Sequence, residues 1–159
     1  MGRRIIVALV QRTKDVGLVI LMAMMFLTII DVFGRKFLQA PVTGSYEVTE
    51  LMLATFVFFS IGYTQLKKGH IAIEAAYTKL PLKARICLDR IVYLISIGLT
   101  LIMTWQLLMH AKRLYLGKTV TGVLHIPIYP FFILAAFGTF IFFLALFLDL
   151  VESFKRVDR

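Results

Sequence analysis

The stretch IVYLISIGLTLIMTWQLLM at residues 91–109 contains no charged side chain, and it decides the fold class. A helix needs roughly 17–25 mainly apolar residues to cross a bilayer. A second charge-free stretch, at residues 126–148, is longer still. Only helices and closed barrels pair every backbone polar group in lipid, and no apolar stretch here alternates with a period of two. The pattern therefore predicts membrane-spanning helices.

Two shorter apolar stretches complete the architecture. Residues 16–33 are interrupted only by Asp31, and residues 51–66 carry no charge. Both reach a spanning length if Asp31, Glu47 and Glu50 lie at helix ends. We therefore predict an all-α integral membrane protein, a single membrane domain over residues 1–159. Its four transmembrane helices are expected at about 14–34, 46–66, 88–110 and 128–149.

The composition excludes the common soluble classes. Of the 159 residues, 60% are hydrophobic and 17% are charged, with a mean hydropathy of +0.86. Soluble domains carry about 25% charged residues. The net charge of +9 would suggest nucleic acid in a soluble protein. In a membrane protein it indicates basic cytoplasmic segments, so we expect membrane lipid and no nucleic acid as a partner. The single cysteine, Cys87, can form neither an internal disulfide nor a CxxC motif.

The distribution of cations predicts the orientation. The two tails and the connection at residues 67–90 hold 13 lysines and arginines, whereas the two other connections hold 5. Cytoplasmic segments are enriched in these residues, so both termini are expected in the cytoplasm.

Two segments are predicted to lie at the membrane surface. The first is residues 3–13, whose apolar run is too short for a signal peptide. The second is residues 70–80, a short amphipathic stretch. Its interfacial residues include His70, Ile71, Ile73 and Glu74.

No arrangement of side chains indicates catalysis. The histidines His70, His110 and His125 fall at helix ends or in connections, whereas a membrane haem needs axial histidines that face one another inside helices. No histidine or cysteine has metal-ligand spacing, and no nucleophile or phosphate-loop motif is present. We expect no enzyme activity and no cofactor in this chain.

A polar cluster is expected where the first two helices meet on the non-cytoplasmic side. Asp31 and Arg35 are four residues apart and Glu47 and Glu50 are three apart, so each pair shares a helix face. Ser45 is the expected N-cap of the second helix. Three carboxylates against Arg35 leave an acidic excess that would attract a basic residue of a partner. The alternative is a set of solvated helix-end charges.

Small and hydroxyl residues form two further candidate contacts. Ser96, Thr100 and Thr104 repeat every four residues, and Ala135, Gly138 and Thr139 form a small-residue patch. Such residues let membrane helices approach closely, either within this chain or against a second membrane subunit.

Three motifs in order resemble a known family. They are DVFGR at residues 31–35, GSYE at residues 44–47 followed by Glu50, and KKGHIAIE at residues 67–74. Together with the four-helix plan, they resemble the small membrane subunit (DctQ-type) of tripartite ATP-independent periplasmic (TRAP) transporters. Many members have a tryptophan near position 46, where this chain has Tyr46, a candidate partner contact.

The resemblance implies a scaffold in a bacterial inner membrane. In this family a large DctM-type membrane subunit carries the substrate and sodium sites, and a periplasmic DctP-type protein delivers an organic acid. The small subunit supports the large one and helps the binding protein to dock, so sodium is expected in the partner. Two alternatives remain: a membrane anchor subunit of a respiratory enzyme, and a stand-alone channel or exporter lined by Ser96, Thr100 and Thr104.

Overall fold

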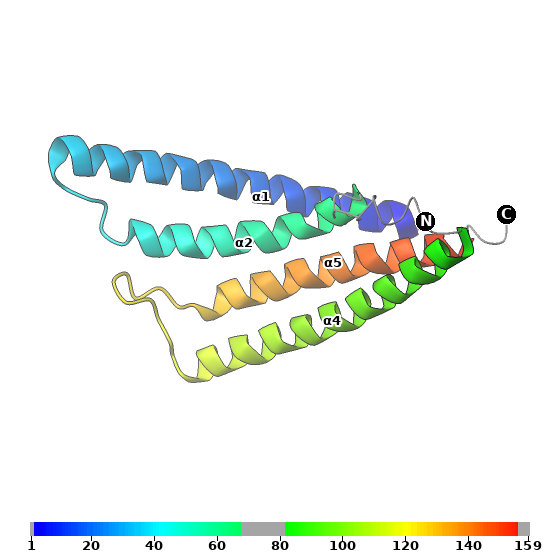
Figure 1. The fold of residues 1–159 in the computed structure, drawn as a ribbon. Coiled ribbons are helices and arrows are strands. Elements are labelled where there is room, and N and C mark those ends of the chain that lie inside the picture. Colours follow the sequence, from blue (N-terminus) through cyan, green and yellow to red (C-terminus); the bar gives the residue numbers. More distant parts are fainter. Residues whose placement is uncertain (1, 68–81, 156–159) are drawn as a thin grey trace.

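The computed structural model describes residues 2–67 and 82–155, and this part of the chain is helical apart from its connections (Figure 1). Helix α1 spans Gly2–Phe33 and continues as a π-helical turn, η1, at Gly34–Leu38. The other helices are α2 at Ser45–Leu66, α4 at Leu82–Leu116 and α5 at Tyr129–Lys155. The predicted all-α fold class is confirmed.

The helices lie side by side in the order α1, α2, α5, α4. Helix α2 packs against α1 on one side and α5 on the other, and α4 packs on α5. The start of α1 and the end of α5 lie at one end of the bundle (Figure 1). The connections at residues 39–44 and 117–128 lie at the other end, which we call the loop end.

Within residues 2–67 and 82–155, three helical segments are long and apolar enough to cross a membrane, where four spans were predicted. They are Arg3–Leu38, Ile91–Leu116 and Tyr129–Val151. The predicted helix at 46–66 exists as α2, but it does not qualify by composition. The reason is its polar content, which is two glutamates near its start and several hydroxyl and amide side chains along it. These are Glu47, Thr49, Glu50, Thr55, Ser60, Thr64 and Gln65.

The two predicted surface segments have different outcomes. Residues 3–13 do not form a separate segment, because they are continuous with α1. Val10 is fully buried there, in a cluster with Ile141 and Ala145 of α5. This contact explains the difference, since a helix that packs on the bundle is not free to lie flat on the membrane. The second segment, residues 70–80 with His70, Ile71, Ile73 and Glu74, lies outside the described residues.

Helix α4 extends well beyond its predicted end at residue 110. It continues to Leu116, where the Gly117 N–H donates to the carbonyl of Arg113 at 2.9 Å. Arg113 lies in the last turn, where a cation is favourable beside the negative end of the helix dipole. The charges at residues 112 and 113 therefore suit a helix end, although the sequence suggested a loop.

Glycines set the distances between neighbouring helices. A Cβ atom on Gly17 of α1 would lie 3.1 Å from the hydroxyl oxygen of Ser60 on α2. On α5, a Cβ atom on Gly138 would lie 2.5 Å from the carbonyl oxygen of Phe58. The α2 and α5 backbones meet at this glycine more closely than any side chain allows.

Candidate partner-docking site

Asp31 is the polar centre of the connection between α1 and α2. Its side chain accepts a hydrogen bond from Arg35, which lies one turn later in η1, and the two side chains form an ion pair. Its other carboxylate oxygen accepts the N–H of Val42 at 3.0 Å. Asp31 is 7% exposed, so these bonds satisfy a nearly buried carboxylate. The predicted pairing of Asp31 with Arg35 is confirmed, and the structure adds that Asp31 fixes the turn.

Glycine, rather than the predicted Ser45, precedes the first turn of α2. The N-cap residue is Gly44, with φ at +78° and no side-chain cap. A Cβ atom on Gly44 would lie 2.3 Å from Leu124, so both the backbone conformation and the contact require glycine here. Ser45 is buried and its hydroxyl is bonded to Asp31. The N-cap prediction was wrong because this hydroxyl serves the neighbouring helix.

Glu47, in the first turn of α2, joins this helix to the connection between α4 and α5. Its carboxylate accepts the N–H of Val123 at 2.7 Å and the N–H of Leu124 at 3.0 Å. The hydrogen bond from Leu124, together with those from neighbouring loop residues, holds the pKa of Glu47 below its usual value. Desolvation acts in the opposite direction. Glu47 lies in the first turn of α2, outside the three candidate spans. It is therefore ionised and engaged at neutral pH.

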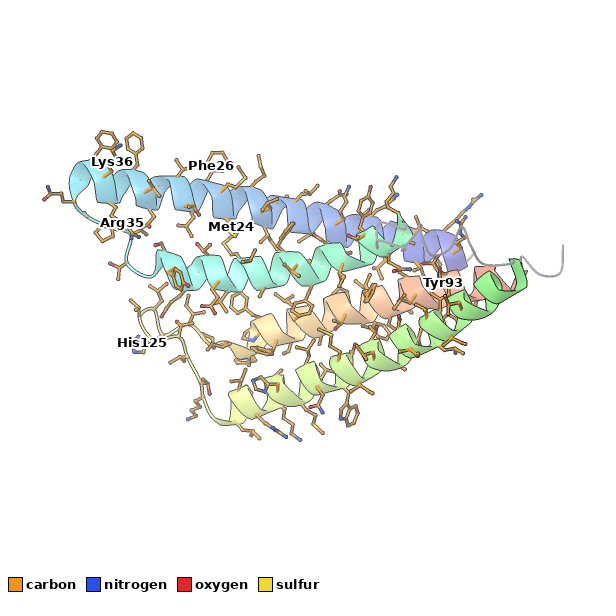
Figure 2. All side chains as sticks on the ribbon, viewed as in Figure 1. Met24, Phe26, Arg35, Lys36, Tyr93 and His125 are labelled. Carbon is orange, nitrogen blue, oxygen red and sulfur yellow. The ribbon has the colours of Figure 1, made fainter. Side chains whose placement is uncertain are left out.

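The connection between α4 and α5 is an ordered loop. The Thr121 N–H donates to the carbonyl of Ile126 at 2.9 Å, and the Ile126 N–H donates to the Thr121 hydroxyl at 3.0 Å. A single β-bridge joins Val120 and Pro127. Residues 122–125 form the tip and are exposed, with His125 at the loop end of the bundle (Figure 2). The tip is therefore presented on a fixed backbone.

The charges left exposed at the loop end are mainly basic. Asp31 and Glu47 are engaged within the chain, so the acidic excess predicted from the sequence is reduced to Glu50, which is exposed. Tyr46 beside it is 83% exposed. The exposed cations at this end are Arg35, Lys36, Lys112, Arg113 and Lys118.

The hydroxyl stripe on α4 is turned inward. Thr100 is 4% exposed and donates to the carbonyl of Ser96 at 2.6 Å. Thr104 donates to the carbonyl of Thr100 at 2.8 Å. These threonine hydroxyls bond their own helix, on the side that packs on α5.

The small-residue patch on α5 lies inside the chain. Ala135, Gly138 and Thr139 are all buried, and Gly138 faces Phe58 of α2. The Thr139 hydroxyl donates to the carbonyls of Ala135 and Ala136, both at 2.9 Å. Helix α2 of the same chain covers the patch at Gly138. Of the two alternatives for this patch, the structure therefore shows packing within the chain.

Like the bonds of Glu47, a second contact between distant polar residues had no precedent in the sequence reasoning. The Gln65 side chain at the end of α2 donates to Asp149 of α5 at 2.6 Å, and Gln65 is buried. The two residues are 84 positions apart, so no local spacing connects them. The signal in the sequence that could have indicated this contact was the amide of Gln65 near the end of α2.

Residues 24–156 match the model of the DctQ family, which is described as the DctQ component of tripartite ATP-independent periplasmic transporters. The chain belongs to the DctQ family. This DctQ chain is therefore a transporter component and not an enzyme. The matched range runs from the middle of α1 through α5 and includes Asp31, Glu47 and the α4–α5 loop. Neither the curated proteins nor the solved structures give a significant match.

Within the described residues, no group of three or more histidine, cysteine or acidic side chains is placed to bind a metal. His110 is exposed, with its ring 4.8 Å from that of Phe132, and His125 lies in the loop. The third histidine, at position 70, lies outside the described residues.

Proposed function

We propose that this DctQ chain is the small scaffold subunit of a sodium-coupled TRAP transporter. It supports a large DctM-type subunit, which carries the substrate and sodium sites, and it helps a periplasmic DctP-type protein to dock for uptake of an organic acid. The family match over residues 24–156 carries this proposal. The arrangement of the acidic residues supports it, because Asp31 and Glu47 hold the loop end together.

The proposed location is the bacterial inner membrane, with both termini in the cytoplasm. The start of α1 and the end of α5 lie together at one end of the bundle (Figure 1), which fits an even number of crossings if α2 returns through the bilayer beside α1 and α5. The polar side chains of α2 are compatible with this path where Thr55 and Gln65 are buried against its neighbours. The excess of cations in the tails and in residues 67–90 supports the cytoplasmic assignment.

Labelling from the two sides of the membrane tests the orientation. A cysteine introduced at Gly2 should react with an impermeant thiol reagent only after the cytoplasmic face is opened. A cysteine introduced at Gly117 should react in intact spheroplasts. Labelling of the Gly117 position only from the cytoplasmic face would contradict the proposed topology.

The loop end is the proposed docking surface for the binding protein. Its loop tip at residues 122–125 is ordered by Glu47, and Tyr46 and Glu50 are exposed beside it. An exposed aromatic side chain on a fixed backbone is a favourable contact for a soluble partner.

The two alternatives have less support. A stand-alone channel lined by Ser96, Thr100 and Thr104 requires open hydroxyls, whereas Thr100 is buried against α5 and the two threonines bond their own backbone. A respiratory anchor with haem requires facing histidines, whereas His110 and His125 lie near the loop end.

Reconstitution in liposomes tests the whole proposal. Liposomes that hold this chain and the large subunit, with the binding protein outside, should take up an organic acid when an inward sodium gradient is imposed. Omission of this chain should abolish uptake. Sodium-driven uptake by this chain alone would contradict the scaffold role.

A further inference from the structure

The two outer helices of the row differ in what they present outside the bundle. Helices α1 and α4 form the edges, and each candidate span on them is only 11% buried within the chain. Something in the membrane must cover both edges, either lipid or another protein. The side chains on each edge decide between the two.

Among the described residues, three helical glycines lie at contacts of α2 with α1 or α5. Gly17 faces α2, Gly62 faces Ile141 of α5, and Gly138 faces α2. Each is within 3.6 Å of an atom of the neighbouring helix, measured from a Cβ placed on the glycine. For Gly98 of α4, no atom lies within 4 Å. It is a glycine of the same kind without a helix opposite it.

Gly98 lies on the face of α4 turned away from α5. It precedes the buried Thr100 by two residues, which is about 200° around an α-helix. Ile102 and Trp105 follow it at the four- and seven-residue spacing of one face, and they are 65% and 63% exposed. The large side chains of Ile102 and Trp105 therefore lie beside a depression in the helix surface at Gly98. Such a shape fits a second helix, because glycine lets two membrane helices approach closely.

Gln106 adds a polar group to the edge of this face. Its side chain is exposed and has no hydrogen-bond partner within the described part of the chain. It lies ten residues before the end of α4, about 15 Å along the helix axis. An unpaired amide in lipid is unfavourable, and a polar side chain of an adjacent membrane helix would satisfy it.

Between residues 16 and 33 the opposite edge has neither feature, and its exposed amide, Gln11, lies nearer the start of α1. The outward face of α1 carries the bulky apolar side chains of Val19, Met22, Phe26 and Ile29, all exposed. Phe26 points away from α2, whereas Met24 points toward it (Figure 2). The Thr28 hydroxyl is already bonded to the carbonyl of Met24 at 2.8 Å. Between residues 16 and 33 this apolar face has no open polar group, which suits contact with lipid chains.

We propose that the outward face of α4, centred on Gly98 with Ile102, Trp105 and Gln106, packs against a transmembrane helix of the large DctM-type subunit, and that the outward face of α1 contacts lipid. The inference rests on the proposed function, since it assigns the surface by which the scaffold holds its partner.

Co-purification of the two membrane subunits tests the assignment. With a tag on the large subunit, Gly98→Leu should lower the recovery of the small subunit at least fivefold. Val19→Phe, which adds bulk to α1, should leave recovery unchanged. A Cβ atom at position 98 has no atom of another helix within 4 Å, so the melting temperature of the small subunit alone should not fall in Gly98→Leu. Wild-type recovery of Gly98→Leu, or a loss with Val19→Phe, would overturn the assignment.

Photocrosslinking identifies the occupant directly. A photoreactive phenylalanine analogue in place of Ile102 should form an adduct with the large subunit, and the same analogue in place of Phe26 should not. Adducts from position 102 with a second copy of this chain, or with lipid only, would refute the α4 assignment. Failure of the wild-type chain to co-purify with the large subunit would instead overturn the proposed function, and with it this inference.

Discussion

The contact between α2 and α5 should be the part of the bundle most sensitive to the addition of one methyl group. In Gly138→Ala the new Cβ atom would lie 2.5 Å from the Phe58 carbonyl oxygen and 2.7 Å from its carbonyl carbon. Real Cβ atoms essentially never approach closer than 3.0 Å, so the two backbones must separate by about 0.5 Å. A gap of that size forfeits about a quarter of the attraction of each contact along the interface.

The expected size of the effect follows from two opposing contributions. Overpacking of this kind costs about 1–3 kcal/mol. The change from glycine to alanine within a helix returns about 0.5–1 kcal/mol. We therefore expect Gly138→Ala to lower the free energy of unfolding by up to about 2.5 kcal/mol, with about 2–4 °C of melting temperature lost per kcal/mol.

Gly98→Ala is the matched control, because it is the same substitution in a helix with open space around the new atom. It should leave the melting temperature of the purified chain in mild detergent unchanged or slightly raised. Thermal unfolding followed by circular dichroism compares the two variants. If Gly138→Ala melts at or above the temperature of Gly98→Ala, the reasoning from backbone contact is refuted.

Three further predictions concern the loop end. Glu47→Gln should speed hydrogen exchange in the α4–α5 loop, since the charged acceptor of two loop amides is lost. The wild type should show the same loosening as pH falls below the usual glutamate pKa of about 4.3, after correction for intrinsic exchange. Because folding lowers the pKa of Glu47, the stabilising effect of its carboxylate on the loop is complete above the usual glutamate pKa and is lost as the pH falls below it. Unchanged exchange at low pH would refute this. Arg35→Ala should reduce uptake by the assembled transporter at least twofold while the chain still reaches the membrane, because Asp31 loses its cation; wild-type uptake would show that the pair is an ordinary helix-end charge pair. Glu50→Gln should leave the melting temperature unchanged, since Glu50 is exposed, and should also reduce uptake; full uptake would exclude Glu50 as a partner contact.

Apolar stretches in the sequence located the helices, but not all of their ends. The predicted helix at 46–66 became Ser45–Leu66, and the one at 128–149 became Tyr129–Lys155. Helix α1 began much earlier than residue 14, because Val10 packs on α5. Hydropathy alone does not report such a contact. The count of spans differed for another reason, since the polar side chains of α2 make it less apolar than a spanning segment by composition.

Local spacing predicted one polar contact and missed the others. Asp31 and Arg35 lie four residues apart, so the helix itself brings them together. Glu47 meets amides 76 and 77 residues away, and Gln65 meets Asp149 at a separation of 84. Those contacts depend on the order of the helices in the row, which no pair of neighbouring residues encodes. The sequence also left open whether the small-residue patch of α5 packs within this chain or against another subunit. In the structure it packs against α2.

The bonds of Glu47 also bear on how readily a partner can be captured. A disordered loop loses conformational freedom when a partner binds, and that loss weakens the complex. Here the loop tip is already held through the Glu47 carboxylate to the first turn of α2, and from Ser45 to Asp31 on α1. A protein that binds this loop therefore contacts a surface that is already ordered. The same bonds connect the α4–α5 loop to both α2 and α1.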